Sequence, residues 1–278
     1  MRPNSPPKPS RSPLLDATGA FVLSACALLP SLASAQEFAL YVSPPRVETS
    51  AKAGETRRQV IELQHVGRET GRFRIYTDDW VLRDDGKVDF SDALAPESCR
   101  PWVALERREL SIPSNGRYRF RFEISPPAGT PPRECRFAVM IEGLDTTKVA
   151  QGAIAFPVAG RIGVIVYARV GDVAPQLVIG KARVAETKSG RLPVVEVSNG
   201  GGATGRLEGF LLAKDADGKE YELSPDPSPI LPGAARTIPL IPVAEDGKPP
   251  PAIRYPLTVK GTLEWGTSRQ PLDLRFEP

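Results

Sequence analysis

The chain has 278 residues with 36 Lys and Arg against 33 Asp and Glu, which gives a formal net charge of +3. Three of those basic residues and one acidic residue lie in the first 35 positions. The rest of the chain is therefore almost neutral and offers no extended cationic surface for nucleic acid or anionic membranes. Thirty prolines and 24 glycines, with few helix-forming runs, predict an all-β protein long enough for two domains.

The N-terminus has the three parts of an export signal. Basic residues precede an apolar core at residues 18–32, and Ala33-Ser34-Ala35 provides a small-x-small cleavage site. The sequence ending in Cys26 also fits a bacterial lipoprotein box, but we prefer cleavage after Ala35 because the apolar run continues past Cys26. No later stretch is apolar enough to span a bilayer. We expect an exported protein without an integral membrane segment.

The exported part of the chain keeps two cysteines, Cys99 and Cys135. An even number of cysteines in an oxidising compartment predicts a disulfide between them, and the alternative is two buried free thiols. Closing a loop of this length stabilises a protein by about 4 kcal/mol on the chain-entropy model.

Residues 36–171 predict about seven short strands, as in an antiparallel sandwich. The first, at residues 38–42, is expected to be an edge strand that is interrupted at Pro44-Pro45, because proline is excluded from central ladder positions. The clearest strand is residues 117–124, where apolar residues alternate with an outward row that we interpret as a solvated face: Arg117, Arg119, Arg121 and Glu123. Further strands are expected at residues 58–64, 71–80, 102–105, 110–112 and 135–141.

Residues 152–170 form the longest nearly continuous apolar run of the exported chain, and we expect a strand there. The second half of the run is apolar on both faces, as a doubly covered strand should be. In the first half, Ile154, Phe156 and Val158 share one face, and the residues between them are alanine or proline. This apolar row needs a cover, which we expect to be a partner's strand or the chain's own domain.

A short, stiff segment at residues 171–175 precedes a second group of predicted strands. These strands are expected at residues 177–185, 192–198, 205–214, 219–223, 235–241, 255–263 and 271–276. We therefore divide the chain into a signal peptide (residues 1–35), an N-terminal sandwich (residues 36–171) and a C-terminal sandwich (residues 172–278).

The sequence offers little for catalysis. His65 is the only histidine, and it lies within a strand pattern where a structural role is expected. No nucleophile elbow, zinc-binding H-E-x-x-H, P-loop or C-x-x-C motif occurs. The aspartate-rich turns that begin at Asp84 and Asp215 lack the glycine and glutamate spacing of a calcium loop. We expect a non-enzymatic protein with no catalytic residue, metal site or cofactor.

Four segments make the chain resemble the PapD-like periplasmic chaperones of pilus assembly. They are residues 42–47 (V-S-P-P-R-V), residues 101–113, the alternating row of Ile154, Phe156 and Val158, and residues 161–171. The resemblance covers most of the first domain, and the second only in architecture. It implies two immunoglobulin-like β-sandwich domains in tandem, set at an angle around a cleft.

The resemblance also implies a function: a periplasmic chaperone that binds pilus, fimbrial or related surface subunits and delivers them to an outer-membrane usher. In this family the exposed row of the last strand is donated to an incomplete subunit fold, and here that row is Ile154, Phe156 and Val158. Arg46 matches the family's cleft arginine, which binds the subunit's C-terminal carboxylate. The family usually pairs this arginine with a lysine. The aligned position here is Gly163, and Arg161, on the same strand face, is the expected substitute.

The alternative is a non-enzymatic structural or adhesion protein of the cell envelope, built of immunoglobulin-like domains, whose own domain covers residues 154–158. Under either hypothesis the free protein must cover an unpaired apolar edge, so self-association through this strand is a further expectation.

Overall fold

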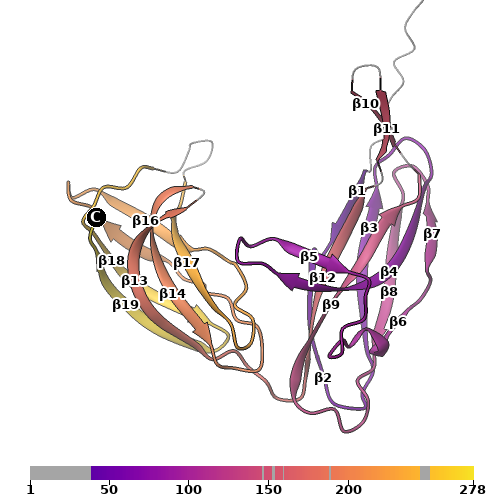
Figure 1. Ribbon diagram of the computed structural model, residues 1–278, viewed down its shortest axis with the longest axis horizontal. Coiled ribbons are helices and arrows are strands. Elements are labelled where there is room, and N and C mark those ends of the chain that lie inside the picture. Colours follow the sequence, from indigo (N-terminus) through magenta and orange to yellow (C-terminus); the bar gives the residue numbers. More distant parts are fainter. Residues whose placement is uncertain (1–38, 146, 152–153, 159, 188, 245–250) are drawn as a thin grey trace, which may run out of the picture. The chain divides into compact units, whose positions relative to one another are not determined.

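The computed structural model describes residues 39–145, 147–151, 154–158, 160–187, 189–244 and 251–278 (Figure 1). For residues 147–151 and 154–158 only the backbone is described. The predicted signal peptide, Cys26 and the cleavage site at Ala35 lie outside these residues. Apart from one 3-10 turn, η1 (Arg100–Trp102), every described regular element is a β-strand, which confirms the predicted all-β class.

The N-terminal part of the described chain forms two main sheets that enclose one core. The first sheet has the order β1 (Leu40–Ser43), β3 (Arg57–His65), β8 (Arg117–Ile124) and β6 (Val103–Leu105). The second has the order β2 (Arg46–Ala51), β12 (Arg161–Val170), β9 (Arg133–Gly143), β4 (Gly71–Leu82) and β5 (Val88–Ser91), and β7 (Glu109–Ile112) also pairs with β4. A sandwich results, as the sequence predicts.

The core of this sandwich comes from the alternation of apolar residues along its strands. Phe120, Phe122 and Ile124 of β8 are at most 1% exposed, and they belong to one apolar cluster with Phe137 of β9 and Val164 of β12. The intervening positions of β8 carry charged residues that face solvent. Period-two alternation therefore produces one dry face and one wet face on this strand.

The two prolines after β1 move the chain from one sheet to the other. β1 pairs with β3 up to Ser43, and β2 begins at Arg46 and pairs in parallel with β12 of the second sheet. Pro44 and Pro45 separate the two strands, as the sequence predicts, because proline cannot donate to a ladder. The switch places the start of β2 beside β12.

The predicted disulfide is present and connects Cys99 with Cys135, whose Cα atoms are 6.0 Å apart. Cys99 directly precedes η1, and Cys135 lies in β9. Both residues are 1% exposed and belong to the core cluster, so the bond ties the η1 turn to the second sheet.

The C-terminal part of the chain forms a seven-stranded sheet around a second apolar core. Its order is β13 (Leu177–Thr187), β14 (Gly190–Asn199), β17 (Ala235–Pro242), β16 (Glu220–Pro225), β15 (Leu211–Lys214), β18 (Leu257–Trp265) and β19 (Ser268–Phe276). β13 and β19, at the two ends of this order, contact each other, so the sheet folds around its own core.

One strand of this part was predicted too long. Only Leu211–Lys214 of residues 205–214 is strand β15, and Gly205 and Glu208 form isolated bridges with Ile230 and Glu264. Gly209 has φ +138°, and a Cβ atom there would overlap the carbonyl oxygen of Thr262. The ladder is therefore interrupted where only glycine fits.

Candidate strand-binding edge

Two antiparallel strand pairs stand where the sequence predicts a single final strand at residues 152–170. β9 pairs with β12, with Glu142 opposite Arg161, and the backbone amide of Gly143 donates to the carbonyl of Gly160. Beyond this point β10 (Thr147–Gln151) pairs with β11 (Ile154–Val158). The predicted strand at residues 152–170 is thus divided into β11 and β12, because the ladder is interrupted around Gly160.

The predicted donor residues occupy alternate positions of β11. Ile154, Phe156 and Val158 are opposite Gln151, Val149 and Thr147 of β10, so they share one face of the hairpin. Pro157 is opposite Lys148 and has no amide hydrogen to donate. The side chains of these residues lie outside what the structure describes, so the cover of the apolar row stays a prediction.

One edge of this hairpin has no partner strand among the described residues. β12 pairs with β2 only from Ile165 onward, where Ile165 is opposite Arg46. On that side Arg161–Val164 have no ladder, and β11 pairs only with β10, within the part of the chain that the structure describes. We call residues 154–158 together with residues 161–164 the free edge. Unpaired backbone groups along such an edge are a template for another strand.

Arg46 lies where the free edge ends. Its side chain is 49% exposed, and its Nε atom is 2.8 Å from Oε1 of Glu48. Glu48 is also 2.9 Å from Arg206 and 3.8 Å from Arg169, so one carboxylate is shared by three guanidinium groups. Arg46 keeps further N–H groups for an incoming anion.

Arg161 lies at the other end of the β12 part of the free edge. It is exposed, and Glu142 opposite it is already 2.6 Å from Arg74. No ion pair of Arg161 occurs within the described residues. Arg161 lowers the pKa of the nearby Tyr76 hydroxyl, and burial of Tyr76, the larger effect, raises it.

Arg46 and Arg161, the two predicted carboxylate anchors, do not lie side by side. Arg161 and Ile165, the residue opposite Arg46, are four positions apart, which corresponds to about 13 Å along a strand. Both arginines lie on the same face of the sheet, because alternate residues of a strand share a face and paired residues of neighbouring strands lie side by side. They therefore bracket Gly163.

Gly163 is covered by an aromatic ring that sequence reasoning did not identify. A Cβ atom at Gly163 would lie 2.6 Å from Cζ of Phe90 and 3.0 Å from Sδ of Met140. Phe90 belongs to β5 and is opposite Trp80 in the β4–β5 hairpin. A lysine at position 163 would require Phe90 to move, which gives a physical reason for the glycine. The sequence predicts a turn that begins at Asp84 but not the surface that this hairpin covers.

The β4–β5 hairpin also buries polar groups on this face of the sheet. Asp78 is 2% exposed, and burial raises its pKa, whereas the nearby cations Arg100 and Arg161 lower it. Trp80 packs edge-to-face on Tyr167, with their ring centroids 5.7 Å apart. This face of the second sheet is thus an additional packed layer and not an ordinary solvated surface.

Two other features of the sequence have structural roles. His65 is 4% exposed, and its ring nitrogens lie 3.1 Å and 2.9 Å from the carbonyl oxygens of Ala39 and Glu69. The side chains of Arg119 and Arg121, in the outward arginine row, are 67% and 62% exposed, which confirms the interpretation of this row as a solvated face.

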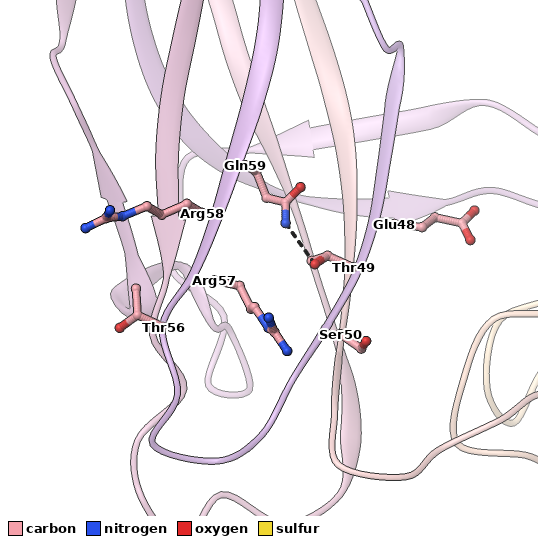
Figure 2. Close-up of a pocket in the computed structure, with 7 residues that line it drawn as sticks. All are labelled: Glu48, Thr49, Ser50, Thr56, Arg57, Arg58 and Gln59. Atoms are coloured by element: carbon pink, nitrogen blue, oxygen red, sulfur yellow. Dashed lines mark hydrogen bonds between the residues drawn. The ribbon is translucent and has the colours of Figure 1, made fainter.

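A polar groove of about 730 Å³ lies between β2 and the start of β3. Figure 2 shows the residues that line it. Gln59 donates a hydrogen bond of 2.9 Å to Thr49 across it (Figure 2). Both arginines that line the groove form ion pairs within the chain: Arg57 is 3.3 Å from Glu55, and Arg58 is 2.6 Å from Glu123. None of the predicted site residues lines this groove.

No group of three or more metal-ligating side chains that would hold an ion occurs among the described residues. In the same part of the chain no helix is long and apolar enough to cross a membrane.

No family model and no curated protein matches the chain. Similar solved structures include the class 5 fimbriae chaperone CfaA, at 12% identity over 86% of this chain and 99% of that chain, with a TM-score of 0.46. The YadV chaperone is 14% identical over 85% of this chain and 98% of that chain, with a TM-score of 0.46. The Escherichia coli chaperone DraB is 15% identical over 85% and 97%, with a TM-score of 0.42.

Proposed function

We propose that the protein is a periplasmic chaperone that binds pilus, fimbrial or related surface subunits through its free edge and delivers them to an outer-membrane usher. The observation that carries the proposal is the unpaired edge at residues 154–158 and 161–164, which ends where β2 begins at Arg46. A subunit lacking one strand would pair its backbone with this edge, and Ile154, Phe156 and Val158 would fill its open core.

The position of Arg46 fixes the direction of the added strand. A strand whose C-terminal carboxylate binds Arg46 must extend from there toward residue 154, so it runs parallel to β11 and β12. Burying three large apolar side chains contributes about 1.5–3 kcal/mol each before the cost of association. The mechanism requires no ATP, metal or nucleic acid.

The first test changes the donated row. Phe156→Asp would place a charge in the subunit core, and we expect it to abolish recovery of a complex with a co-expressed fimbrial subunit. The matched control is Val178→Asp, because Val178 is an exposed apolar residue of β13 (62%) outside the free edge. Equal recovery with both variants would contradict the proposal and support the alternative, a structural or adhesion protein whose own domain covers residues 154–158.

The second test changes the carboxylate anchor. Arg46→Ala removes the guanidinium group at the end of the free edge, and we expect at least a tenfold loss of affinity for the subunit. Arg58→Ala is the control, since Arg58 is 82% exposed and lies on β3. An unchanged affinity for Arg46→Ala would remove the anchor from the mechanism.

A further inference from the structure

We propose that Phe90 is a specificity-determining residue that selects an apolar side chain near the C-terminal end of the bound strand. This inference rests on the proposed function, since it assigns a preference to the same edge. Beyond that function, it assigns to Phe90 the recognition of one side chain near the C-terminus of the bound strand.

The position of the Phe90 ring is the first step. Its Cζ atom lies 2.6 Å from the place where a Cβ of Gly163 would be, so the ring tip covers the backbone of β12. Residues 161–164 of β12 have no neighbouring strand on the other side within the described chain. The ring of Phe90, which is half-buried, therefore reaches the border of the slot that an added strand would occupy.

The spacing of strands then places a partner side chain against this ring. Neighbouring strands lie about 4.8 Å apart, so the partner residue beside Gly163 has its backbone within one strand spacing of the ring. Gly163 has no side chain that would fill the space between them. An apolar partner residue packs on Phe90, whereas a charged one would lose water beside Met140, which is fully buried.

The two arginines define which partner residue this is. Gly163 lies two positions from Ile165, which is opposite Arg46, and two positions from Arg161. With the partner's carboxylate at Arg46, the residue beside Gly163 is one of its last three. Along the free edge, Arg46 is thus followed by the Phe90 ring over Gly163 and then by Arg161. This order suits an extended strand that has a C-terminal carboxylate, then an apolar residue, then a polar residue.

The test uses synthetic peptides, because no natural partner is needed. The peptides are fluorescein-labelled decapeptides of alternating valine and threonine, with two N-terminal lysines and a free C-terminal carboxylate. In separate peptides, each of the last three positions is replaced by Phe, Leu, Ala or Lys. Fluorescence anisotropy gives Kd for the full chain and for Phe90→Ala, Phe90→Leu and Val81→Ala. Val81 is the matched control, since it lies in the same hairpin and is 66% exposed.

We expect the wild type to prefer Phe over Ala at one of the three positions by about three- to tenfold. Phe90→Ala should remove this preference, Phe90→Leu should retain part of it, and Val81→Ala should retain all of it. Equal preference in Phe90→Ala, or binding of every peptide with the same affinity by the wild type, overturns the inference and leaves the proposed function in place. If no peptide binds to the wild type, the inference is overturned; the proposed function fails as well only if Phe156→Asp still captures a subunit.

Discussion

The size of the residue that fits at position 163 depends on Phe90, which is far away in the sequence. The Phe90 ring lies over Gly163, and the sulfur of Met140 lies beside it. We expect Gly163→Lys to destabilise the protein by about 1–3 kcal/mol, because extra atoms in a packed layer force their neighbours to shift. Urea denaturation followed by circular dichroism measures this change in the free energy of unfolding.

A double-mutant cycle tests the cause of that loss. In a Phe90→Ala background the space over Gly163 is open, so Gly163→Lys should cost much less than in the wild type. If the cost is the same in both backgrounds, the steric account of Gly163 is wrong.

Asp215 and Tyr221 form a second residue-scale arrangement, at the turn between β15 and β16. Asp215 accepts hydrogen bonds from the backbone amides of Asp217 and Lys219 at 3.0 Å and 2.9 Å, and from the Tyr221 hydroxyl at 2.7 Å. These contacts explain why this aspartate-rich turn is a structural turn. The bond from Tyr221 and the two amides lower the pKa of Asp215, whereas burial and the bond to Asp215 raise the pKa of Tyr221 to about 12.

The raised pKa predicts a loss of stability at high pH. An unfolded tyrosine ionises near pH 10, whereas folded Tyr221 keeps its proton up to about pH 12. Between these values the unfolded state binds fewer protons, so the free energy of unfolding falls as pH rises from about 10 to 12. Tyr221→Phe should make this fall less steep in denaturation curves recorded at several pH values. Equal slopes for Tyr221→Phe and the wild type would refute the assignment.

Residues on one strand were predictable from the sequence, and residues brought together by the fold were not. The places of Ile154, Phe156 and Val158 on one face of a strand and the pairing of the two cysteines follow from alternation and from cysteine count. The contact of Phe90 with Gly163 depends on how the β4–β5 hairpin lies over the sheet, and no local sequence pattern predicts that arrangement.

At the scale of elements, the β10–β11 hairpin is an extension of the β9–β12 hairpin. Its two strands pair only with each other within the described chain, whereas β12 pairs with β9 and β2. Among the described residues the extension therefore contributes no ladder to the N-terminal sandwich, so we expect its loss to affect binding more than folding.

Replacing residues 147–158 with Asn-Gly should separate binding from stability. The ladder between Glu142 and Arg161 and the bond between Gly143 and Gly160 are retained, so we expect a thermal midpoint within a few degrees of the wild type. Recovery of a co-expressed subunit should be lost. A large drop in the thermal midpoint would show that the extension is part of the folded core and would remove the deletion as evidence for a binding role.

Element boundaries followed the sequence where alternation was regular and departed from it at glycines. Residues 117–124 were predicted with the observed bounds of β8. Residues 205–214 were predicted as one strand, but the backbone at Gly209 interrupts the ladder. The run at residues 152–170 is divided into β11, which ends at Val158, and β12, which begins at Arg161. Apolar patterning locates a strand, and close backbone approach at glycine ends it.

At the scale of the whole molecule, the described chain has two separate apolar cores. One lies between the sheets of the N-terminal sandwich, and the other is enclosed by the C-terminal sheet. The domain boundary near residues 171–172 stays a prediction; β12 ends at Val170 and β13 begins at Leu177. Tandem sandwiches were predictable because each group of strands supplies its own apolar faces, and we expect each core to unfold as its own cooperative unit.

The disulfide offers a way to test this division. Cys99 and Cys135 both belong to the N-terminal core, so replacing both with alanine should lower only the transition of that sandwich. The loss of about 4 kcal/mol from closing the loop corresponds to about 10–20 °C in a sandwich of this size. Asp215→Ala should lower only the other transition, because Asp215 stabilises a turn of the C-terminal sheet. Differential scanning calorimetry of the wild type and both variants measures the two transitions separately, and a single transition that both variants lower together would show that the two cores unfold as one unit.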